Sequence, residues 1–397
     1  MDLFAKCYET FIQDEIRDMG LYPYFHALES RQDVTVTMEG ARRIMLGSNN
    51  YLGLTVEPAV IEAGIAALRQ YGTGCSGSRF LNGTLQLHLE LEAELADFLH
   101  QDAAMTFSTG FQSNLGAISA IAGHGDYILC DKENHASIYD GCKLSFARMY
   151  TFKHNDMQDL ERLLAAYSPK GGILIVTDGV FSMTGEIANL PEIVRLARQY
   201  GARVMVDDAH GLGVLGEGGR GTPSHFGLEK EVDLYMGTFS KSLASLGGYV
   251  AGSARIIDYM RHASRPFIFS ASIPPACAAS ALAALRHLRA HPELVQRLQD
   301  LSEYARAGMH RRQIPMIEAE TPIIPIYTYE PGNTLRKAKE IYEAGVYVNP
   351  VLPPACNPGE CLLRTSYMAS LTEALIDEAL DQIAGVLKGG VRAWERS

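Results

Sequence analysis

Short apolar runs alternate with amphipathic helical segments along most of the chain, and this alternation limits the possible folds more than any other feature. Seven runs have the length and composition of buried strands: 104–109, 126–131, 148–152, 172–181, 202–210, 233–239 and 247–252. Helical patterns separate several of them, including 157–167 and 190–201. Strands separated by helices are typical of a mainly parallel, doubly wound α/β sheet. We therefore predict such a sheet at the centre of the protein.

Two other regions flank this pattern. Residues 1–30 look helical and then turn at Leu21–Phe25, and Val34–Leu46 alternates as a small hairpin does. A long helical segment at 275–313 precedes strand-like runs at 322–329, 343–354 and 362–369 and a closing helix at 371–387. We therefore expect an N-terminal helix and hairpin segment at 1–55, a large domain at 56–290 and a smaller α+β domain at 291–397.

Charge and cysteine content narrow the classes of function. The chain has 35 Lys and Arg against 46 Asp and Glu, a formal charge of −11, and no basic block that would attract nucleic acid. Its seven cysteines are scattered and never spaced C-x-x-C, as in reduced cytoplasmic proteins. We find no signal peptide and no run near ~18 apolar residues. A cytoplasmic protein is expected, with peripheral membrane contact left open.

Two glycine-rich stretches match G-x-G-x-x-G, at 72–77 and 211–216. A dinucleotide site needs a strand before the glycines and a helix directly after them. The first stretch follows a helical pattern, and the second runs into EGGRGTPSHFG, which cannot begin a helix. A nicotinamide-dependent oxidoreductase is therefore disfavoured, and the glycines are interpreted as turns or as neighbours of a ligand.

Two strand ends carry the residues with the clearest chemistry. The run 202–210 ends in Asp207, with His210 three residues later, and the run 233–239 leads through Thr238 and Ser240 to Lys241. Pyridoxal phosphate needs a Schiff-base lysine, a carboxylate for its pyridine nitrogen and small hydroxyls for its phosphate. Lys241, Asp207, Thr238 and Ser240 fit these roles, and His210 fits a hydrogen bond to the phenolic oxygen.

Each of these residues has an ordinary structural explanation when taken alone. A strand-end Asp often caps a helix, a single Lys is usually a surface charge, and an Asp-x-His pair can bind metal. No third ligand cluster stands out, so we expect no metal. Ser108–Phe111 ends one strand and begins a helix, which makes an anion site, and His135 follows another strand, where its ring can stack on a pyridine. Together these features favour pyridoxal phosphate.

The chain resembles the α-oxoamine synthase family, pyridoxal-phosphate enzymes of aminotransferase fold type I. The resemblance covers nearly the whole chain in order. It is carried by SNNYLGL (48–54), GSRFLNGT (77–84), STGF (108–111), NHASIYDG (134–141), DGVFSMTGEIANLPEI (178–193), VDDAHGLG (206–213), GTFSKSLASLGG (237–248), RPFIFSASIPPA (265–276) and LLRTSYMA (362–369).

The resemblance implies roles for individual residues. Lys241 would hold the cofactor and move the Cα proton, with Asp207 at the pyridine nitrogen and His135 stacked on the ring and near the substrate carboxylate. Cofactor contacts would also come from His210, Ser182, Thr238, Ser240, Gly110 and Phe111, and from Ser272 reaching the other subunit's phosphate. Arg364 would bind the substrate carboxylate beside Asn49 or Asn50, a choice that spacing leaves open.

The implied reaction is a decarboxylative condensation of an amino acid with an acyl-CoA in a homodimer whose active sites lie at the subunit interface. Three segments most resemble bacterial members that join L-serine to a long-chain acyl-CoA: YPYF near the start, the segment around Lys241, and NPVLPPACNPGE. Sibling synthases using another amino acid or acyl-CoA are the alternative. Non-catalytic relatives lack the Schiff-base lysine. Because Lys241 is present in this chain, a non-catalytic role is disfavoured. Leu352 stands where some members have an arginine before Pro353-Pro354, so a role for a second arginine is in doubt.

Overall fold

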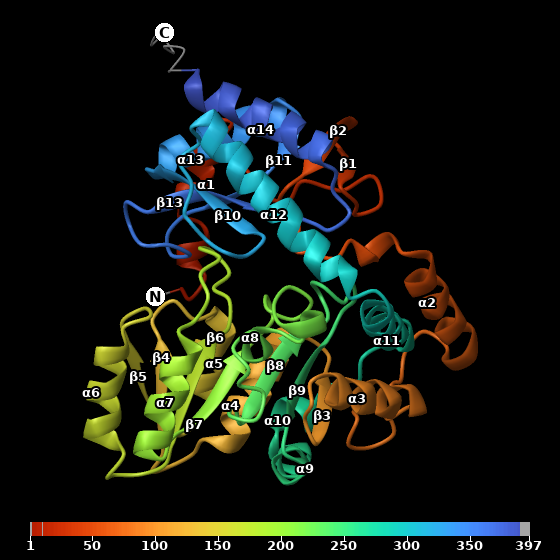
Figure 1. The fold of residues 1–397 in the computed structure, drawn as a ribbon, viewed down its shortest axis with the longest axis vertical. Helices are drawn as coiled ribbons and strands as arrows, with labels where there is room; N and C mark the ends of the chain where they lie inside the picture. The colour runs from red at the N-terminus through yellow and green to blue at the C-terminus, as the bar shows by residue number, and fades with distance from the viewer. Residues whose placement is uncertain (1, 10, 390–397) are drawn as a thin grey trace.

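A seven-stranded sheet forms the centre of the larger lobe, the lower part of Figure 1. Its strand order is β3 (Ala103–Phe107), β9 (Gly248–Gly252), β8 (Leu234–Thr238), β7 (Arg203–Asp207), β6 (Ile173–Asp178), β4 (Tyr127–Asp131) and β5 (Arg148–Phe152). Neighbours from β8 to β5 are parallel, whereas β9 is antiparallel to both of its neighbours. The predicted mainly parallel sheet is confirmed.

The structure is a computed structural model, and it describes residues 2–9 and 11–389. The predicted N-terminal segment includes residues 1 and 10, and the predicted C-terminal domain includes residues 390–397, all of which lie outside the described residues. No helix in the described ranges is long and apolar enough to cross a membrane.

Helices cover both faces of the large sheet because its strand side chains alternate between two apolar cores. Alternate strand residues such as Met105, Ile128 and Met205 pack beneath one set of helices: α4 (Gly110–Ile121), α5 (Ala136–Leu144), α9 (Ala254–Ala263) and α10 (Arg265–Ile268). Their sequence neighbours face the other set: α2 (Pro58–Tyr71), α3 (Gln86–Phe98), α6 (Met157–Tyr167), α7 (Leu190–Tyr200) and α11 (Pro275–Ala290). The sheet is therefore doubly wound.

The smaller lobe, at the top of Figure 1, combines the N-terminal hairpin with the C-terminal region. One sheet joins β1 (Thr35–Met38), β2 (Ala41–Met45) and β11 (Val346–Tyr347), and another joins β10 (Ile323–Tyr329), β13 (Cys361–Ser366) and β12 (Asn349–Val351). The helices are α12 (Glu293–Arg312), α13 (Pro331–Glu343) and α14 (Glu373–Lys388). Because β2 pairs with β11, residues far apart in the sequence share one core.

Two helical expectations are wrong in part. Within the described residues of 1–30, only η1 (Ala5–Cys7) and α1 (Ile12–Asp18) are helical, since Gly20 turns the chain with φ 65° and Pro23 follows. The segment 275–313 forms two helices, α11 and α12, rather than one. The break falls at His291, whose φ of −129° is not helical, because the Pro292 ring disfavours helical backbone before it.

The remaining elements are three short helices: η2 (Leu54–Val56), η3 (Glu217–Gly219) and α8 (Thr222–His225). The carboxyl edge of the large sheet faces the smaller lobe in Figure 1. Asp131, Asp178, Asp207 and Thr238 are the last residues of β4, β6, β7 and β8. Ligands of open α/β sheets bind outside the carboxyl ends of the strands, so this edge is where a site is expected.

Candidate active site

A cavity of about 210 Å³ opens at the carboxyl edge of the large sheet. Loops after four parallel strands and the first turn of α4 contribute its walls, and this gathers residues from five parts of the sequence. The lining residues include Thr109, Gly110, Phe111, His135, Asp178, Ser182, Asp207, His210, Thr238, Ser240 and Lys241.

Lys241 follows β8 and presents its amine to this cavity. Its Nζ makes no hydrogen bond or ion pair with any residue that the structure describes. Burial lowers the pKa of Lys241 to about 8, with Arg364 adding to the effect, although Asp207 and Asp178 act in the opposite direction. A lysine with this pKa is partly unprotonated near neutral pH and is suited to attack a carbonyl.

Asp207 ends β7 and is 5% exposed. Its Oδ2 accepts a hydrogen bond from Asn114 Nδ2 at 2.7 Å, and its Oδ1 accepts one from the Ala209 N–H at 3.1 Å. Both donors fix the carboxylate where it lines the cavity. Asn114 lies on α4 and also donates to Ser137 Oγ at 2.8 Å. Asn114 is not predictable from the sequence, because a polar residue inside a helix gives no signal of its partner.

The start of α4 and the end of β8 form a pocket for an anion. The N–H groups of Gly110 and Phe111 make no hydrogen bond with other described residues, as is usual in the first turn of a helix. Opposite them, Thr238 Oγ1 lies 2.8 Å from Ser240 Oγ. Gly110 allows this approach, since an added Cβ would lie 2.8 Å from Thr238 Cβ. The four predicted phosphate residues thus meet in one place.

His135 caps the N-terminus of α5 and lines the same cavity. Its Nδ1 accepts a hydrogen bond from the Ser137 N–H at 3.2 Å and lies 2.7 Å from Ser137 Oγ. Burial lowers the pKa of His135, and Lys241 acts in the same direction. The ring is therefore neutral near pH 7, which suits stacking on an aromatic ligand.

His210 and Tyr51 meet at the back of the cavity. Tyr51 is fully buried, and its hydroxyl lies 2.6 Å from His210 Nδ1 and accepts from Arg364 Nη2 at 3.3 Å. Burial lowers the pKa of His210 well below its usual value, and Lys241 and Arg364 add to this. Tyr51 was not singled out from the sequence, although it stands inside the SNNYLGL motif.

Arg364 reaches the edge of this group from β13 of the smaller lobe and is 4% exposed. Its Nε donates to the Ser182 carbonyl at 2.5 Å, and its Nη2 donates to Asn49 Oδ1 at 2.9 Å. Asn50 points elsewhere and donates to Thr55 Oγ1 at 2.7 Å. Of the two asparagines left open by the sequence, Asn49 is the one beside Arg364.

Ser272 does not line the cavity in this chain. Its hydroxyl donates to the carbonyl oxygens of Gly77 and Gly83, at 3.1 and 2.7 Å, and ties down the loop between them. A contact between Ser272 and the other subunit's phosphate stays a prediction.

Asp178 is a further residue of the cavity that the sequence did not predict. Its Oδ2 accepts from the His135 N–H at 3.1 Å, while its buried Oδ1 has no partner among the described residues. Burial raises the pKa of Asp178 well above the usual value, and the nearby Asp207 reinforces the rise. An unpartnered buried oxygen facing a cavity indicates that the site holds a polar group there.

The second glycine-rich stretch has a structural explanation. The buried Asp208 carboxylate accepts hydrogen bonds from the Thr222 N–H at 2.8 Å and the Thr222 hydroxyl at 2.6 Å. A Cβ at Gly211 or Gly221 would overlap that carboxylate. These glycines make room for Asp208, and they are turns rather than a dinucleotide site.

The cavity as a whole can hold a small aromatic phosphate. It offers an amine, a fixed carboxylate, neutral imidazoles and an anion pocket, which is the donor set that pyridoxal phosphate requires. Among residues 2–9 and 11–389, no group of three or more His, Cys, Asp or Glu side chains is arranged to hold a metal ion.

Comparison with known proteins agrees with this geometry. The profile of aminotransferases of class I and II matches residues 41–383. A serine palmitoyltransferase of Sphingobacterium spiritivorum is 50% identical over 377 residues, which cover 95% of this chain and 94% of the relative. An 8-amino-7-oxononanoate synthase of Geobacter sulfurreducens is 43% identical and covers 94% of this chain and 96% of its own. A solved serine palmitoyltransferase with a PLP internal aldimine is 36% identical, with a TM-score of 0.94, and covers 97% of this chain and 98% of its own.

Proposed function

Because the chain belongs to the family of class I and II aminotransferases, we propose that it is a pyridoxal-phosphate-dependent serine palmitoyltransferase. The reaction joins L-serine to palmitoyl-CoA, or another long-chain acyl-CoA, and yields 3-ketosphinganine, CoA and CO2. The observation that carries the proposal is the convergence of Lys241, Asp207 and an anion pocket on one cavity, in a chain half identical to a serine palmitoyltransferase.

The residues of the cavity would hold the cofactor through distinct contacts. Gly110, Phe111, Thr238 and Ser240 fit the phosphate, and Asp207 fits the pyridine nitrogen. His210 and Ser182 lie on the side suited to the phenolic oxygen, with His135 against the ring. When bound, pyridoxal phosphate supplies a protonated ring that accepts the electron pair released at the amino acid's Cα.

Lys241 is the proton-transfer group of the proposed mechanism. With a pKa of about 8, part of the population is unprotonated at neutral pH and can take a proton from Cα of L-serine. The Cα electron pair then forms the new bond to the thioester carbonyl carbon, and CoA leaves as the thiolate. Loss of CO2 frees a second electron pair at the same carbon, and Lys241 returns a proton to it.

Arg364 and Asn49 would bind the serine carboxylate. Arg364 is held by Ser182, Asn49 and Tyr51 in the orientation that the structure shows, and its guanidinium is a suitable partner for a carboxylate. His135 lines the cavity and would help to orient the same group.

A homodimer and a cytoplasmic location complete the proposal. Leu81 and Phe269 are 76% and 75% exposed, in segments joined by the Ser78–Ala271 bridge, and a second subunit would cover such apolar side chains. All seven cysteines are free thiols, as in the cytoplasm. Sedimentation velocity tests the dimer, which Leu81→Glu is expected to weaken.

The first test of function is release of CoA thiol from palmitoyl-CoA by the cofactor-loaded protein with serine, glycine or alanine. Release with serine alone supports the proposal. Release with glycine or alanine instead would assign a sibling activity, for which the 43% identical 8-amino-7-oxononanoate synthase is the supporting observation. No release with any of the three would contradict the proposed function.

A further inference from the structure

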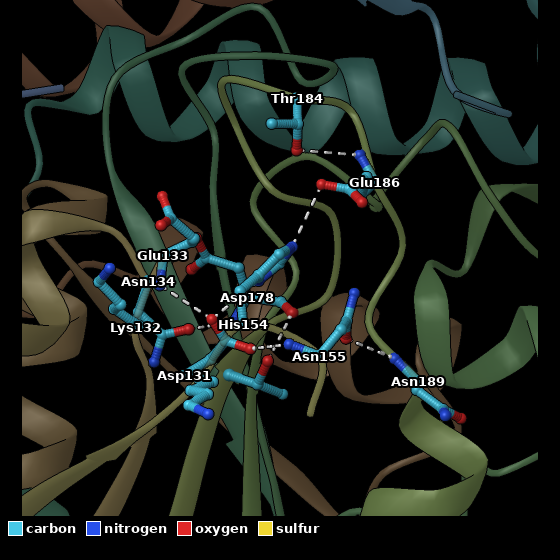
Figure 2. A network of polar contacts seen from close by, with 12 residues as sticks. Asp131, Lys132, Glu133, Asn134, His154, Asn155, Asp178, Thr184, Glu186 and Asn189 are labelled. Atoms are coloured by element: carbon cyan, nitrogen blue, oxygen red, sulfur yellow. Dashed lines mark hydrogen bonds and ion pairs between the residues drawn. The ribbon is translucent and has the colours of Figure 1, made fainter. Parts of the chain in front are cut away.

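A histidine outside the cavity connects two of its walls. His154 lies in the loop after β5, between Asp131 at the end of β4 and Glu186 in the loop after β6, as Figure 2 shows. Its Nδ1 is 2.9 Å from Asp131 Oδ1, and its Nε2 is 3.2 Å from Glu186 Oε2. The edge of its ring also packs against Phe181, with ring centroids 4.3 Å apart.

The two contacts determine the charge of His154. Each ring nitrogen faces a carboxylate, which accepts but does not donate when ionised, so both nitrogens carry a proton and the ring is an imidazolium. Burial lowers the pKa of His154, but the hydrogen bonds and charges of Asp131 and Glu186 outweigh it and raise the pKa to about 10. Two anions and one cation thus form a partly buried cluster.

One side of the cluster fixes the turn that carries His135. Asp131, 1% exposed, also accepts from the N–H groups of Glu133 at 2.8 Å and Asn155 at 2.9 Å. Asn134 comes later in that turn, and its side-chain amide hydrogen-bonds the main chain of β6 through both its nitrogen and its oxygen. His135 follows, and its N–H donates a hydrogen bond to the Asp178 carboxylate.

The other side fixes the loop that carries Ser182. Within that loop, the Phe181 N–H donates to the Glu186 carbonyl at 2.9 Å, and the Gly185 N–H donates to the Phe181 carbonyl at 2.9 Å. The Ser182 carbonyl accepts from Arg364 Nε. The ion pair to Glu186 therefore holds the segment on which the guanidinium of Arg364 rests.

We propose that His154 is a positioning residue that, by tying Asp131 to Glu186, sets the spacing between the His135 turn and the Ser182 loop that supports Arg364. This inference rests on the proposed function, in which His135 and Arg364 share the amino-acid carboxylate. His154 touches neither substrate nor cofactor, and it acts through these two walls.

The charged groups that face His154 are few. Asp131 and Glu186 contact the ring, Lys153 and Asp156 flank it in the sequence, and Lys132 and Glu133 lie beside Asp131 in Figure 2. A pKa raised from 6.5 to about 10 contributes stability that is full below pH 6.5 and is lost as pH rises through about 10.

The test compares His154→Gln and Glu186→Gln with His310→Gln, which alters an exposed single pair with Glu318. Spectral titration of the cofactor-loaded proteins gives the Kd for L-serine. Both cluster variants are expected to bind serine roughly tenfold more weakly, with KM rising more than kcat falls, and the control is expected to match the parent. In the double variant, the second substitution should add little to the first.

A second measurement needs neither cofactor nor substrate. The thermal midpoint of the cofactor-free parent should exceed that of His154→Gln near pH 6.5, and the difference should close as pH approaches 10. A difference in thermal midpoint that does not change with pH would contradict the assignment of His154 as an imidazolium. Unchanged serine affinity in Glu186→Gln, whose carboxylate is 41% exposed, would overturn the positioning role even if His154→Gln fails to fold. A parent that binds no serine would instead overturn the proposed function.

Discussion

At the scale of single residues, Lys241 carries the most specific expectation. Because its pKa is lowered to about 8, mainly by burial, its unprotonated fraction rises through pH 8 rather than through the ordinary value of 10.5. The rate at which cofactor-free protein captures pyridoxal phosphate, followed by absorbance, should therefore rise up to about pH 8 and then level off. A rate that keeps rising towards pH 10 would contradict the lowered pKa. Lys241→Ala should show no such absorbance change and no turnover.

Tyr51 provides a second test at this scale. The Tyr51 hydroxyl lies 2.6 Å from His210 Nδ1 and 3.3 Å from Asn49 Oδ1, so its proton goes to His210 Nδ1, the nearer and more basic acceptor, and the His210 proton stays on Nε2. Tyr51→Phe leaves a buried nitrogen without its donor, which should cost roughly 1–3 kcal/mol in the free energy of unfolding. Weaker binding of pyridoxal phosphate should accompany this loss, because the ring of His210 is no longer held.

The matched control for Tyr51→Phe is Tyr249→Phe. Tyr249 is also fully buried, but its hydroxyl has no hydrogen-bond partner among the described residues. This substitution should change the unfolding free energy by less than about 0.5 kcal/mol, since no bond is lost. Equal losses in the two variants, measured by urea unfolding, would show that the bond from Tyr51 to His210 contributes nothing.

The sequence predicts some of these residues and misses others for a physical reason. Lys241, Asp207, Thr238 and His135 follow strands, and parallel strands bring their carboxyl ends to one edge whatever the details of packing. Asn114 reaches Asp207 only because α4 packs at a particular angle on the sheet. Asn49 and Asn50 are adjacent in a turn, and only the backbone conformation decides which one faces Arg364.

At the scale of elements, the loop 211–222 offers a test of why its glycines are there. Gly221 has φ 95°, and a Cβ there would overlap the Asp208 carboxylate. Gly218 also has a left-handed φ, 60°, but an added Cβ would meet only Arg220 Nη1 at 3.9 Å. Gly218→Ala should therefore cost about 1 kcal/mol from backbone strain alone.

Gly221→Ala should cost more, about 2–4 kcal/mol, because its φ of 95° and ψ of −169° suit only glycine and overpacking against Asp208 adds to that strain. Urea unfolding followed by circular dichroism measures both variants. Similar losses of unfolding free energy at the two positions would mean that the loop adjusts to the added methyl group and that the Asp208 carboxylate does not hold it in place.

Element boundaries were predicted best where the pattern had strong stops. The helix expected at 157–167 has those bounds in α6, which follows the capping residue Asp156 and ends before Ser168. The helical pattern at 275–313 does not reveal the break between α11 and α12, because apolar periodicity continues across Pro292 and only the proline itself marks the break. Residues 1–30 have helical composition, but much of that segment is exposed and lacks the packing that stabilises most helices.

At the scale of the whole molecule, the candidate site depends on both lobes. Arg364 comes from β13 of the smaller lobe, whereas Ser182 and the cavity belong to the larger one. α12 links the two, since Val295 and Leu298 pack in the larger core and Leu301 and Ala305 in the smaller. Periodicity predicts each lobe separately, whereas the position of Arg364 beside the cavity follows from tertiary packing. The domain limits at 55 and 290 stay predictions.

The central claim is that L-serine loses both its Cα proton and its carboxyl carbon as it is joined to a long-chain acyl group. The most direct test supplies palmitoyl-CoA and L-serine that carries deuterium at Cα and carbon-13 in the carboxyl group, and analyses the product by mass spectrometry. We predict 3-ketosphinganine without the carbon-13 label and with most of the deuterium exchanged for hydrogen through Lys241, carbon-13 in the released CO2, and no product with Lys241→Ala. A product that keeps the carboxyl carbon or all of the deuterium, or one formed equally by Lys241→Ala, would contradict the account.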